Sequence, residues 1–242
     1  MDIKIALITG ANKGLGFESA RILGQKGFRV YIGARDKKRG EEAAAALKKE
    51  GFDARFLQLD VTSDSSVTDA AKQLAEQEKH LDVLINNAGI ALLDRDGKGS
   101  VSTIEVMKET YEVNVFGPFR VTKAFLPLLK NSKQASVVMV SSGLGSVTLH
   151  ADPNSWMATV EAIAYNSSKT ALNGVMIGFA NEFKAYGIKV NSVNPGYNAT
   201  DLNNNQGTYP PTHGAGIIVK AAHLDSAGPT GTFVDQDQSC PW

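Results

Sequence analysis

The sequence predicts an α/β protein with a doubly wound parallel sheet and helices on both of its faces. Short apolar runs rich in β-branched residues alternate along the chain with longer amphipathic stretches. The strand candidates at 4–9 (KIALIT) and 81–86 (LDVLIN) are apolar on both sides, as expected for a sheet covered on both faces. A glycine-rich turn follows the first of these runs directly, before a helical stretch.

The elements follow from this alternation in chain order. Strands are expected at 3–8, 28–32, 54–59, 81–85, 136–140, 188–193 and 232–234. Helices are expected at 14–26, 36–50, 63–79, 104–129 (one or two helices), 160–186 and, as a short one, 214–223. Gly27 and Gly51 suit the ends of the first two helices, where glycine adopts a left-handed backbone without strain.

Two segments break the alternation. Residues 143–159 are expected to be long and irregular, and residues 197–212 are rich in Asn, Gly and Pro. The second segment is expected to be a mobile loop, and long loops in α/β proteins are often functional.

Composition limits the classes of function. With 43% hydrophobic and 21% charged residues, the chain is typical of a globular protein that forms one large domain. Lys and Arg equal Asp and Glu at 25 each, which favours neither a nucleic acid nor an anionic membrane as partner. Cys240 is the only cysteine, so no intrachain disulfide can form. No signal peptide and no membrane span is recognised in the sequence, so a cytoplasmic location is expected.

The turn after the first strand predicts a nucleotide site. Residues 9–16 read TGANKGLG, which places Gly10, Gly14 and Gly16 between a strand and a helix. Glycines permit a tight turn and a close approach to a pyrophosphate, and the helix N-terminus offers free N–H groups. The spacing is G-x-x-x-G-x-G rather than the general G-x-G-x-x-G. Its position makes nucleotide binding a better explanation than a plain turn.

The end of the second strand bears on the choice of cofactor. Asp36 is near the position where an acid would bind the ribose 2′-OH of NAD, but it also suits the N-cap of the following helix. Arg35 and Lys13 flank the same expected pocket and would bind a 2′-phosphate. Together they favour NADP(H).

Seven short motifs occur in an order that resembles the short-chain dehydrogenase/reductase family over nearly the whole chain. They are TGANKGLG at 9–16, Asp60-Val61, Asn86-Asn87-Ala88-Gly89, Asn114, Ser142, Tyr165-x-x-x-Lys169 and Asn194-Pro195-Gly196. The glycine turn followed by Arg35 most resembles the NADPH-dependent carbonyl reductase branch. The resemblance implies one Rossmann-like domain over 1–242, with a cofactor-binding part at about 1–115 and a catalytic part at about 116–242.

The chemistry of carbonyl reduction explains the residue types of the resemblance. A ketone needs a hydride at carbon and a proton at oxygen, and Tyr165 would donate that proton. The ammonium of Lys169, one helical turn later, would lower the phenolic pKa and, as in the family, hold the nicotinamide ribose. Ser142 would bind the substrate oxygen. Ser142 fits the family's Ser-x-x-Gly through Gly145, whereas Ser141 does not.

The remaining roles come from the resemblance alone. Asn114 would sit at a helix irregularity and hold a water that links Lys169 to solvent. Cofactor contacts are expected at Gly10, Asn12, Lys13, Gly14, Leu15, Gly16, Arg35, Asp60, Val61, Asn87, Ala88, Gly89, Tyr165, Lys169, Pro195, Gly196 and Thr200. The histidines at 80, 150, 213 and 223 lack metal-ligand spacing, so no metal site is expected.

The sequence departs from the family pattern before the tyrosine. Ser142 and Tyr165 are 23 positions apart, about twice the usual separation in the family. The extra segment resembles an insertion of monomeric carbonyl reductases. Trp156 is expected to anchor it by packing, and lining of the pocket is the alternative. A monomer and a homo-oligomer both remain open. The compact region after Tyr197 leaves little lid, which predicts an open pocket and loose substrate preference.

The expected function is reduction of ketones and aldehydes to alcohols with NADPH. Two other enzymes stay open: a 3-oxoacyl-carrier-protein reductase, and an NAD-dependent alcohol dehydrogenase tied to Asp36. A non-catalytic NADP-sensing protein is the remote alternative, because such a protein would be expected to have lost Tyr165, Lys169 or Ser142.

Overall fold

A computed structural model describes residues 3–222, 228–236 and 239–242 and has a parallel sheet at its centre. The strands are β1 (Ile5–Thr9), β2 (Arg29–Ala34), β3 (Ala54–Gln58), β4 (Val83–Asn86), β5 (Ser136–Val140), β6 (Lys189–Val193) and β7 (Phe233–Val234). They pair in parallel in the order β3-β2-β1-β4-β5-β6-β7. The chain reverses its direction of winding between β1 and β4, and ligands of such sheets bind where strands end at that switch point.

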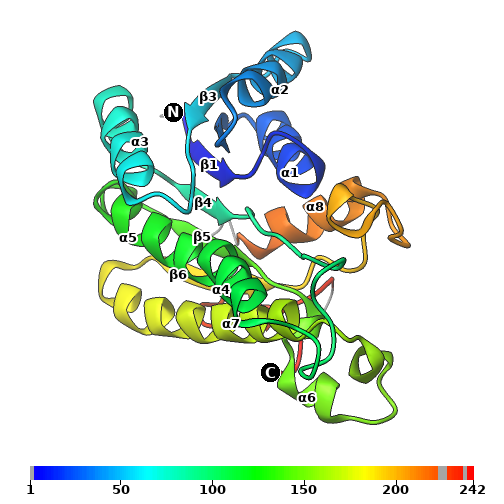
Figure 1. Ribbon diagram of the computed structural model, residues 1–242. Coiled ribbons are helices and arrows are strands. Elements are labelled where there is room, and N and C mark those ends of the chain that lie inside the picture. The colour runs from blue at the N-terminus through cyan, green and yellow to red at the C-terminus, as the bar shows by residue number, and fades with distance from the viewer. Residues whose placement is uncertain (1–2, 223–227, 237–238) are drawn as a thin grey trace.

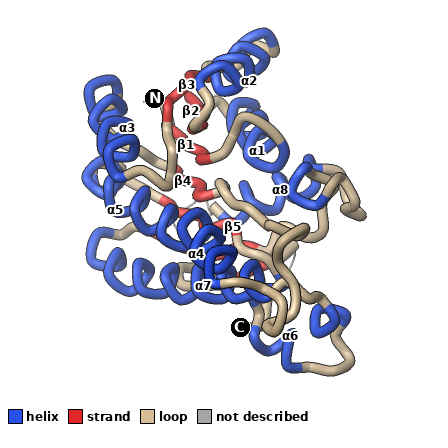
Figure 2. Tube along the Cα trace, viewed as in Figure 1, coloured by secondary structure: helices blue, strands red, loops and turns tan. Residues whose placement is uncertain are grey.

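Helices cover both faces of the sheet, which confirms the predicted fold class (Figures 1 and 2). They are α1 (Gly14–Gln25), α2 (Lys37–Lys49), α3 (Asp64–Gln77), α4 (Ile104–Tyr111), α5 (Gly117–Lys130), α6 (Val147–Ala151), α7 (Ile163–Phe183) and α8 (Pro211–Ala221). Residues of α1, α2 and α8 form one apolar layer with the sheet, and residues of α3, α5 and α7 form the other. None of the helices within the described ranges is both long enough and apolar enough to cross a bilayer.

The expected boundaries differ from the structure mainly where long helices were predicted. The stretch 104–129 contains α4 and α5 joined by a π-helix, Glu112–Phe116. The stretch 160–186 begins as a helix only at Ile163, and Lys184–Tyr186 forms a 3-10 turn. The short helix expected at 214–223 begins earlier, at Pro211, and His223 lies outside the described residues.

The two segments expected to lack regular structure contain short elements. Residues 143–159 hold two 3-10 turns, Gly143–Gly145 and Trp156–Thr159, with α6 between them. Residues 197–212 hold the 3-10 turn Asp201–Asn203 and the start of α8. Local Ser side chains explain the short elements within 143–159, because they accept hydrogen bonds from the backbone where each element begins.

Candidate active site

The turn between β1 and α1 provides a cradle for an anion. Gly10 and Gly14 have φ of +63° and +58°, a left-handed backbone that favours glycine. A Cβ on Gly16 would lie 2.5 Å from Nδ2 of Asn87, so a side chain there would displace the neighbouring turn. The N-cap of α1, Lys13, makes no side-chain capping bond to the first turn. The backbone N–H groups in the first turn of α1 and the positive end of the helix dipole therefore suit a phosphate. Asn12 and Leu15 are half-buried in the same turn.

The turn after β4 is fixed to the glycine turn by hydrogen bonds. The Thr9 hydroxyl accepts from the backbone N–H groups of Asn87 and Ala88, at 3.0 Å each. The Asn87 side chain donates to the carbonyls of Thr9 (2.9 Å) and Gly10 (3.2 Å). The two turns that the sequence assigns to the cofactor therefore form one unit at the switch point of the sheet.

Gly89 and Asn114 lie between this unit and the catalytic helix α7. A Cβ on Gly89 would lie 3.3 Å from Asn114 Oδ1 and 3.5 Å from Lys169 Nζ. The fully buried Asn114 amide donates to the Ile90 carbonyl (2.9 Å) and the Ser168 hydroxyl (3.0 Å), and its oxygen accepts from the Ile90 N–H (2.9 Å). Asn114 lies within the π-helix, and such irregularities occur often at functional sites. The expected water relay stays a prediction.

Tyr165 and Lys169 lie one turn apart on α7, with Lys169 Nζ 5.6 Å from the centre of the Tyr165 ring. Lys169 is only 5% exposed, and its ammonium donates to the Val140 carbonyl at 2.9 Å. Burial lowers the pKa of Lys169 to about 8, because a low-dielectric surrounding disfavours the charged form. Burial raises the pKa of the Tyr165 phenol, and a side-chain hydrogen bond with Ser142 opposes that rise. The expectation that Lys169 lowers the phenolic pKa was therefore wrong, because burial disfavours the phenolate more than the surroundings favour it.

The structure separates the two candidate serines at the end of β5. The Ser142 side chain interacts with the Tyr165 phenol and also accepts from the Leu144 N–H at 3.2 Å. The Ser141 hydroxyl is 3% exposed and donates to the Lys169 carbonyl at 3.4 Å. Ser142 is therefore the serine beside the phenol, whereas Ser141 contacts the backbone of α7. The role of Ser142 toward a substrate stays a prediction.

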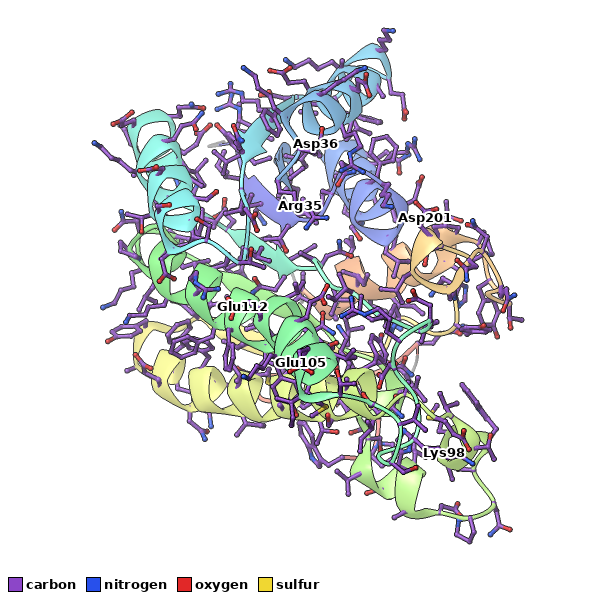
Figure 3. All side chains as sticks on the ribbon, in the orientation of Figure 1. Arg35, Asp36, Lys98, Glu105, Glu112 and Asp201 are labelled. Carbon is purple, nitrogen blue, oxygen red and sulfur yellow. The ribbon has the colours of Figure 1, made fainter. Side chains whose placement is uncertain are left out.

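Asp36 and Arg35 occupy different surroundings at the start of α2, where Figure 3 labels both. The Asp36 carboxylate accepts from the Arg39 N–H at 2.9 Å and therefore caps α2. Arg35 follows β2 directly and is exposed. Lys13 is also exposed, and its ammonium forms an ion pair with Asp201 at 2.5 Å.

Asp60 and Val61 lie beyond the end of β3, at the same edge of the sheet. Asp60 Oδ1 accepts from the Thr62 N–H (3.0 Å) and the Thr62 hydroxyl (2.7 Å), which fixes the turn into α3. Val61 is 8% exposed and packs on α5, where a Cβ on Gly117 would lie 3.0 Å from its methyl group.

The segment after β6 extends over the first turn of α1. Gly196 has φ of +81°, and the buried Asn198 amide donates to the carbonyls of Pro195 (2.8 Å) and Gly196 (2.9 Å). The Thr200 methyl group lies 3.7 Å from the position of a Cβ on Gly14. The structure thus places Thr200 beside the glycine turn. Asn198, which the sequence did not reveal, holds the backbone at Pro195 and Gly196.

Asp96 is a second residue that sequence reasoning missed. Its carboxylate accepts from the N–H groups of Ala164 (3.2 Å) and Tyr165 (3.0 Å), so it caps the start of α7 from the loop after β4. A carboxylate at a helix N-terminus is stabilising because it faces the positive end of the dipole. The separation of 69 positions between Asp96 and Tyr165 hides this contact from local patterns.

The extra segment before α7 is not anchored by Trp156, which is 59% exposed. Instead, Met157 reaches inward, and its Cε lies 2.5 Å from the position of a Cβ on Gly143. The same Cβ position is 3.2 Å from Asn194 Nδ2. The prediction for Trp156 was therefore wrong, because the 3-10 turn points the neighbouring methionine toward the residue after Ser142.

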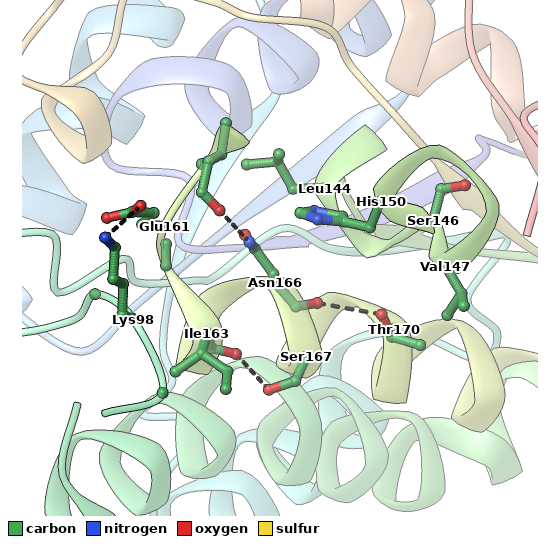
Figure 4. Close-up of a pocket in the computed structure, with 14 residues that line it drawn as sticks. Lys98, Leu144, Ser146, Val147, His150, Glu161, Ile163, Asn166, Ser167 and Thr170 are labelled. Carbon is green, nitrogen blue, oxygen red and sulfur yellow. Dashed lines mark hydrogen bonds and ion pairs between the residues drawn. The ribbon is translucent and has the colours of Figure 1, made fainter. Parts of the chain in front are cut away.

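A cavity of about 340 Å³ is lined in part by residues of the extra segment (Figure 4). It is bounded by α6, residues 97–99 and the face of α7 that carries Asn166, Ser167 and Thr170. Within the described part of the chain, His150 Nε2 and Asn166 Oδ1 are buried there without a hydrogen-bond partner. No group of three or more His, Cys, Asp or Glu side chains among the described residues could hold a metal ion.

Comparisons with known proteins support the resemblance. Residues 4–210 match the model of the short chain dehydrogenase family. The (+)-neomenthol dehydrogenase of Arabidopsis thaliana is 32% identical, with 97% of each chain covered. The (-)-isopiperitenone reductase of Mentha piperita is 29% identical, with 98% of this chain and 97% of the relative covered. The NADPH-bound carbonyl reductase from chicken fatty liver superimposes with a TM-score of 0.88 at 26% identity, and the match covers both chains completely.

Proposed function

The chain belongs to the short chain dehydrogenase family, and from that premise we propose that it reduces ketones and aldehydes to alcohols with NADPH. Members of the family are oxidoreductases that act on CH–OH or C=O groups with a nicotinamide cofactor. The observation that carries the proposal is the arrangement of Ser142, Tyr165 and Lys169 at the switch point of the sheet, beside the glycine turn.

The residues present fit a dinucleotide. The glycine cradle admits a pyrophosphate where any Cβ on Gly16 would collide with Asn87, and the first turn of α1 lacks a side-chain cap. We assign the adenosine side to Asp60, Val61 and the turn at residues 87–89. The nicotinamide side falls to Tyr165, Lys169 and the segment containing Pro195, Gly196 and Thr200.

The proposed mechanism divides the reaction between cofactor and protein. The bound cofactor supplies a hydride to the carbonyl carbon. The Tyr165 Oη–H bond breaks as its proton passes to the carbonyl oxygen, so that one hydride and one proton complete the alcohol. The raised pKa of Tyr165 keeps the phenol protonated near neutral pH, ready to donate. Ser142 donates a hydrogen bond to the same oxygen and stabilises its developing negative charge.

Lys169 contributes a positive charge beside the phenol. With its pKa lowered to about 8, the ammonium stays mostly protonated near pH 7 and stabilises the phenolate left after proton transfer. Its bond to the Val140 carbonyl fixes the ammonium between Tyr165 and the Gly89 turn. We assign it the nicotinamide ribose as well.

The NADPH preference rests on the acid and the bases beside the glycine turn. Asp36 uses its carboxylate to cap α2, which argues against the NAD alternative. Arg35 is exposed at the end of β2, and Lys13 is exposed at the start of α1. A guanidinium and an ammonium at these places would recognise a 2′-phosphate. The chicken carbonyl reductase that shares the fold is described as NADPH-bound.

The relatives guide the substrate class. Their names refer to neomenthol and isopiperitenone, and we propose carbonyl compounds of small to medium size for this chain as well. The alignment with the Arabidopsis enzyme extends over 288 positions, more than the 242 residues here, so that relative has segments this chain lacks. This fits the expectation of an open pocket, with Met157 as a proposed wall next to Ser142. One domain over 1–242 and a cytoplasmic location remain our predictions.

A parallel screen tests the proposal. A panel of ketones and aldehydes is incubated with NADPH and, separately, with NADH, and the absorbance of the reduced nicotinamide is followed. We expect carbonyl-dependent oxidation of NADPH that exceeds oxidation of NADH across several compounds. The proposal fails if no compound is reduced, or if NADH is the better donor throughout.

A further inference from the structure

The Lys13 ammonium, assigned above to a 2′-phosphate, already has an acidic partner. Its Nζ lies 2.5 Å from Asp201 Oδ2, and this ion pair joins the glycine turn to the segment after β6. The hydrogen bond from Lys13 and its positive charge stabilise the Asp201 carboxylate and so lower the pKa of Asp201. A carboxylate therefore stands where the negative cofactor group is expected.

The backbone around Asp201 is held in place independently of this pair. The Thr200 N–H donates to the Asn203 side-chain oxygen at 3.1 Å, and Asn203 Nδ2 donates to the Asn198 carbonyl at 2.8 Å. The Asn205 N–H donates to the Thr200 carbonyl at 2.8 Å. The Asp201 carboxylate also has a side-chain hydrogen bond with Asn205, but the three bonds above do not involve it. Removal of the Asp201 charge therefore leaves the turn with these three hydrogen bonds.

A phosphate should bind the Lys13 ammonium more strongly than the Asp201 carboxylate does. The side chains of Lys13 and Asp201 are 55% and 60% exposed, and such exposed pairs contribute little because water screens them. A phosphate monoester carries nearly two negative charges and three acceptor oxygens, against one charge for a carboxylate. Lys13 would thus prefer the 2′-phosphate, at the cost of its bond to Asp201.

We propose that Asp201 is a specificity-determining residue that competes with the cofactor's 2′-phosphate for Lys13 and so moderates the preference for NADPH over NADH. The inference rests on the proposed NADPH-dependent function. NADH has no 2′-phosphate, so it binds while the Lys13–Asp201 pair stays intact. The 2′-phosphate of NADPH must first displace the Asp201 carboxylate from Lys13. The protein's affinity for NADPH is therefore lower than it would be if Arg35 and Lys13 had no acidic neighbour.

The opposite effect would follow if the pair served as a latch. A bond between the glycine turn and the segment at Thr200 would hold the cofactor's pyrophosphate in place whether or not the 2′-phosphate is present. Loss of Asp201 would then weaken NADPH and NADH alike. Binding measured with both cofactors separates competition from latching.

The test measures dissociation constants by isothermal calorimetry, without turnover. The ligands are NADP⁺, NAD⁺ and the fragments 2′,5′-ADP and 5′-AMP, which differ in the 2′-phosphate but lack nicotinamide. The proteins are wild type, Asp201→Asn, Lys13→Met and the double variant. Asp69→Asn, an exposed carboxylate of α3, is the control for the same change in net charge.

We expect Asp201→Asn to bind NADP⁺ and 2′,5′-ADP about threefold to fivefold more tightly, as an exposed ion pair predicts. NAD⁺ and 5′-AMP should be unchanged, Asp69→Asn should match wild type, and Lys13→Met should abolish the gain in the double variant. Unchanged or weaker binding of NADP⁺ by Asp201→Asn overturns the inference, as does an equal gain in Asp69→Asn. If wild type itself fails to favour NADP⁺ over NAD⁺, the proposed cofactor preference falls first, and the inference with it.

Discussion

Two lysines at the same edge of the sheet show how surroundings decide what a cation can do. Lys169 is 5% exposed, donates to a backbone carbonyl and has its pKa lowered to about 8. The Lys13 side chain is 55% exposed and pairs with the carboxylate of Asp201. Burial fixes the Lys169 ammonium in place and makes its pKa sensitive to neighbouring groups. Exposure leaves the Lys13 ammonium weakly bound to Asp201 and able to exchange partners.

The difference assigns each lysine a separate part of the function. A fixed buried ammonium can act on the ionisation of a phenol, which requires constant geometry. An exposed ammonium suits recognition of a charged group that arrives with the cofactor. Substitutions at the buried end should therefore change turnover, and substitutions at the exposed end should change the choice of cofactor.

The largest effect is expected for Tyr165→Phe. Phenylalanine retains the ring and removes the proton donor, so carbonyl reduction should fall by about 10³-fold or more, within the range for general acid catalysis. Calorimetric binding of NADP⁺ should stay within about twofold of wild type, because the phenol is not assigned to the phosphates. Reduction at the normal rate by this variant would remove Tyr165 from its role.

Ser142→Ala should lower kcat by about 10²-fold, since one hydrogen-bond donor to a developing oxyanion has effects of this size. Ser141→Ala is the matched control, and its loss of a 3.4 Å bond to the Lys169 carbonyl should change kcat by less than about fivefold. Steady-state kinetics on one ketone compares the two. A larger loss in Ser141→Ala than in Ser142→Ala would contradict the assignment.

Arg35→Ala tests the exposed end. Loss of a charge-assisted bond to a 2′-phosphate should raise the dissociation constant of NADPH by about tenfold or more, and that of NADH should not change. Arg39→Ala, which changes an exposed arginine in the first turn of α2, is the control. Equal loss of both cofactors in Arg35→Ala would rule out recognition of the 2′-phosphate.

The last prediction concerns stability and pH, where the change within any one pH unit is small. Between pH 8 and 10.5, Lys169 is deprotonated in the folded protein but protonated in the unfolded chain, so the unfolded chain binds more protons. The free energy of unfolding of wild type should therefore rise with pH relative to Lys169→Met, by at most about 1.4 kcal/mol per pH unit. Below pH 8 the difference in the free energy of unfolding between wild type and Lys169→Met should not change with pH. Urea unfolding at several pH values measures it, and a flat difference across the range would show that Lys169 is not desolvated.

Much of this arrangement could be predicted from local patterns. Alternation of apolar runs predicted the sheet and its helices, because burial on both faces requires apolar strands. The N-cap interpretation of Asp36 followed from its place before a helix, and the structure confirms that capping bond. The proximity of Ser142 to Tyr165 agrees with the expected pairing, although its catalytic role awaits the kinetics described above.

Other features depend on contacts between distant parts of the chain. The Asp96 carboxylate reaches the start of α7 across 69 residues, and no helical or strand period reveals such a contact. The π-helix around Asn114 forms where a buried amide must reach Ile90 and Ser168 at once. The exposure of Trp156 and the inward position of Met157 depend on the direction of one short turn, which composition does not encode.

The most direct test compares Lys13→Met with Lys169→Met in one experiment. Each variant is measured for binding of NADPH and NADH and for kcat with NADPH at saturation. The account predicts that Lys13→Met lowers NADPH affinity selectively and retains kcat. Lys169→Met should lose kcat by orders of magnitude while the ratio of the two affinities stays at the wild-type value. Selective loss of NADPH affinity in Lys169→Met, or loss of kcat at saturation in Lys13→Met, would contradict the division between a buried catalytic charge and an exposed recognition charge.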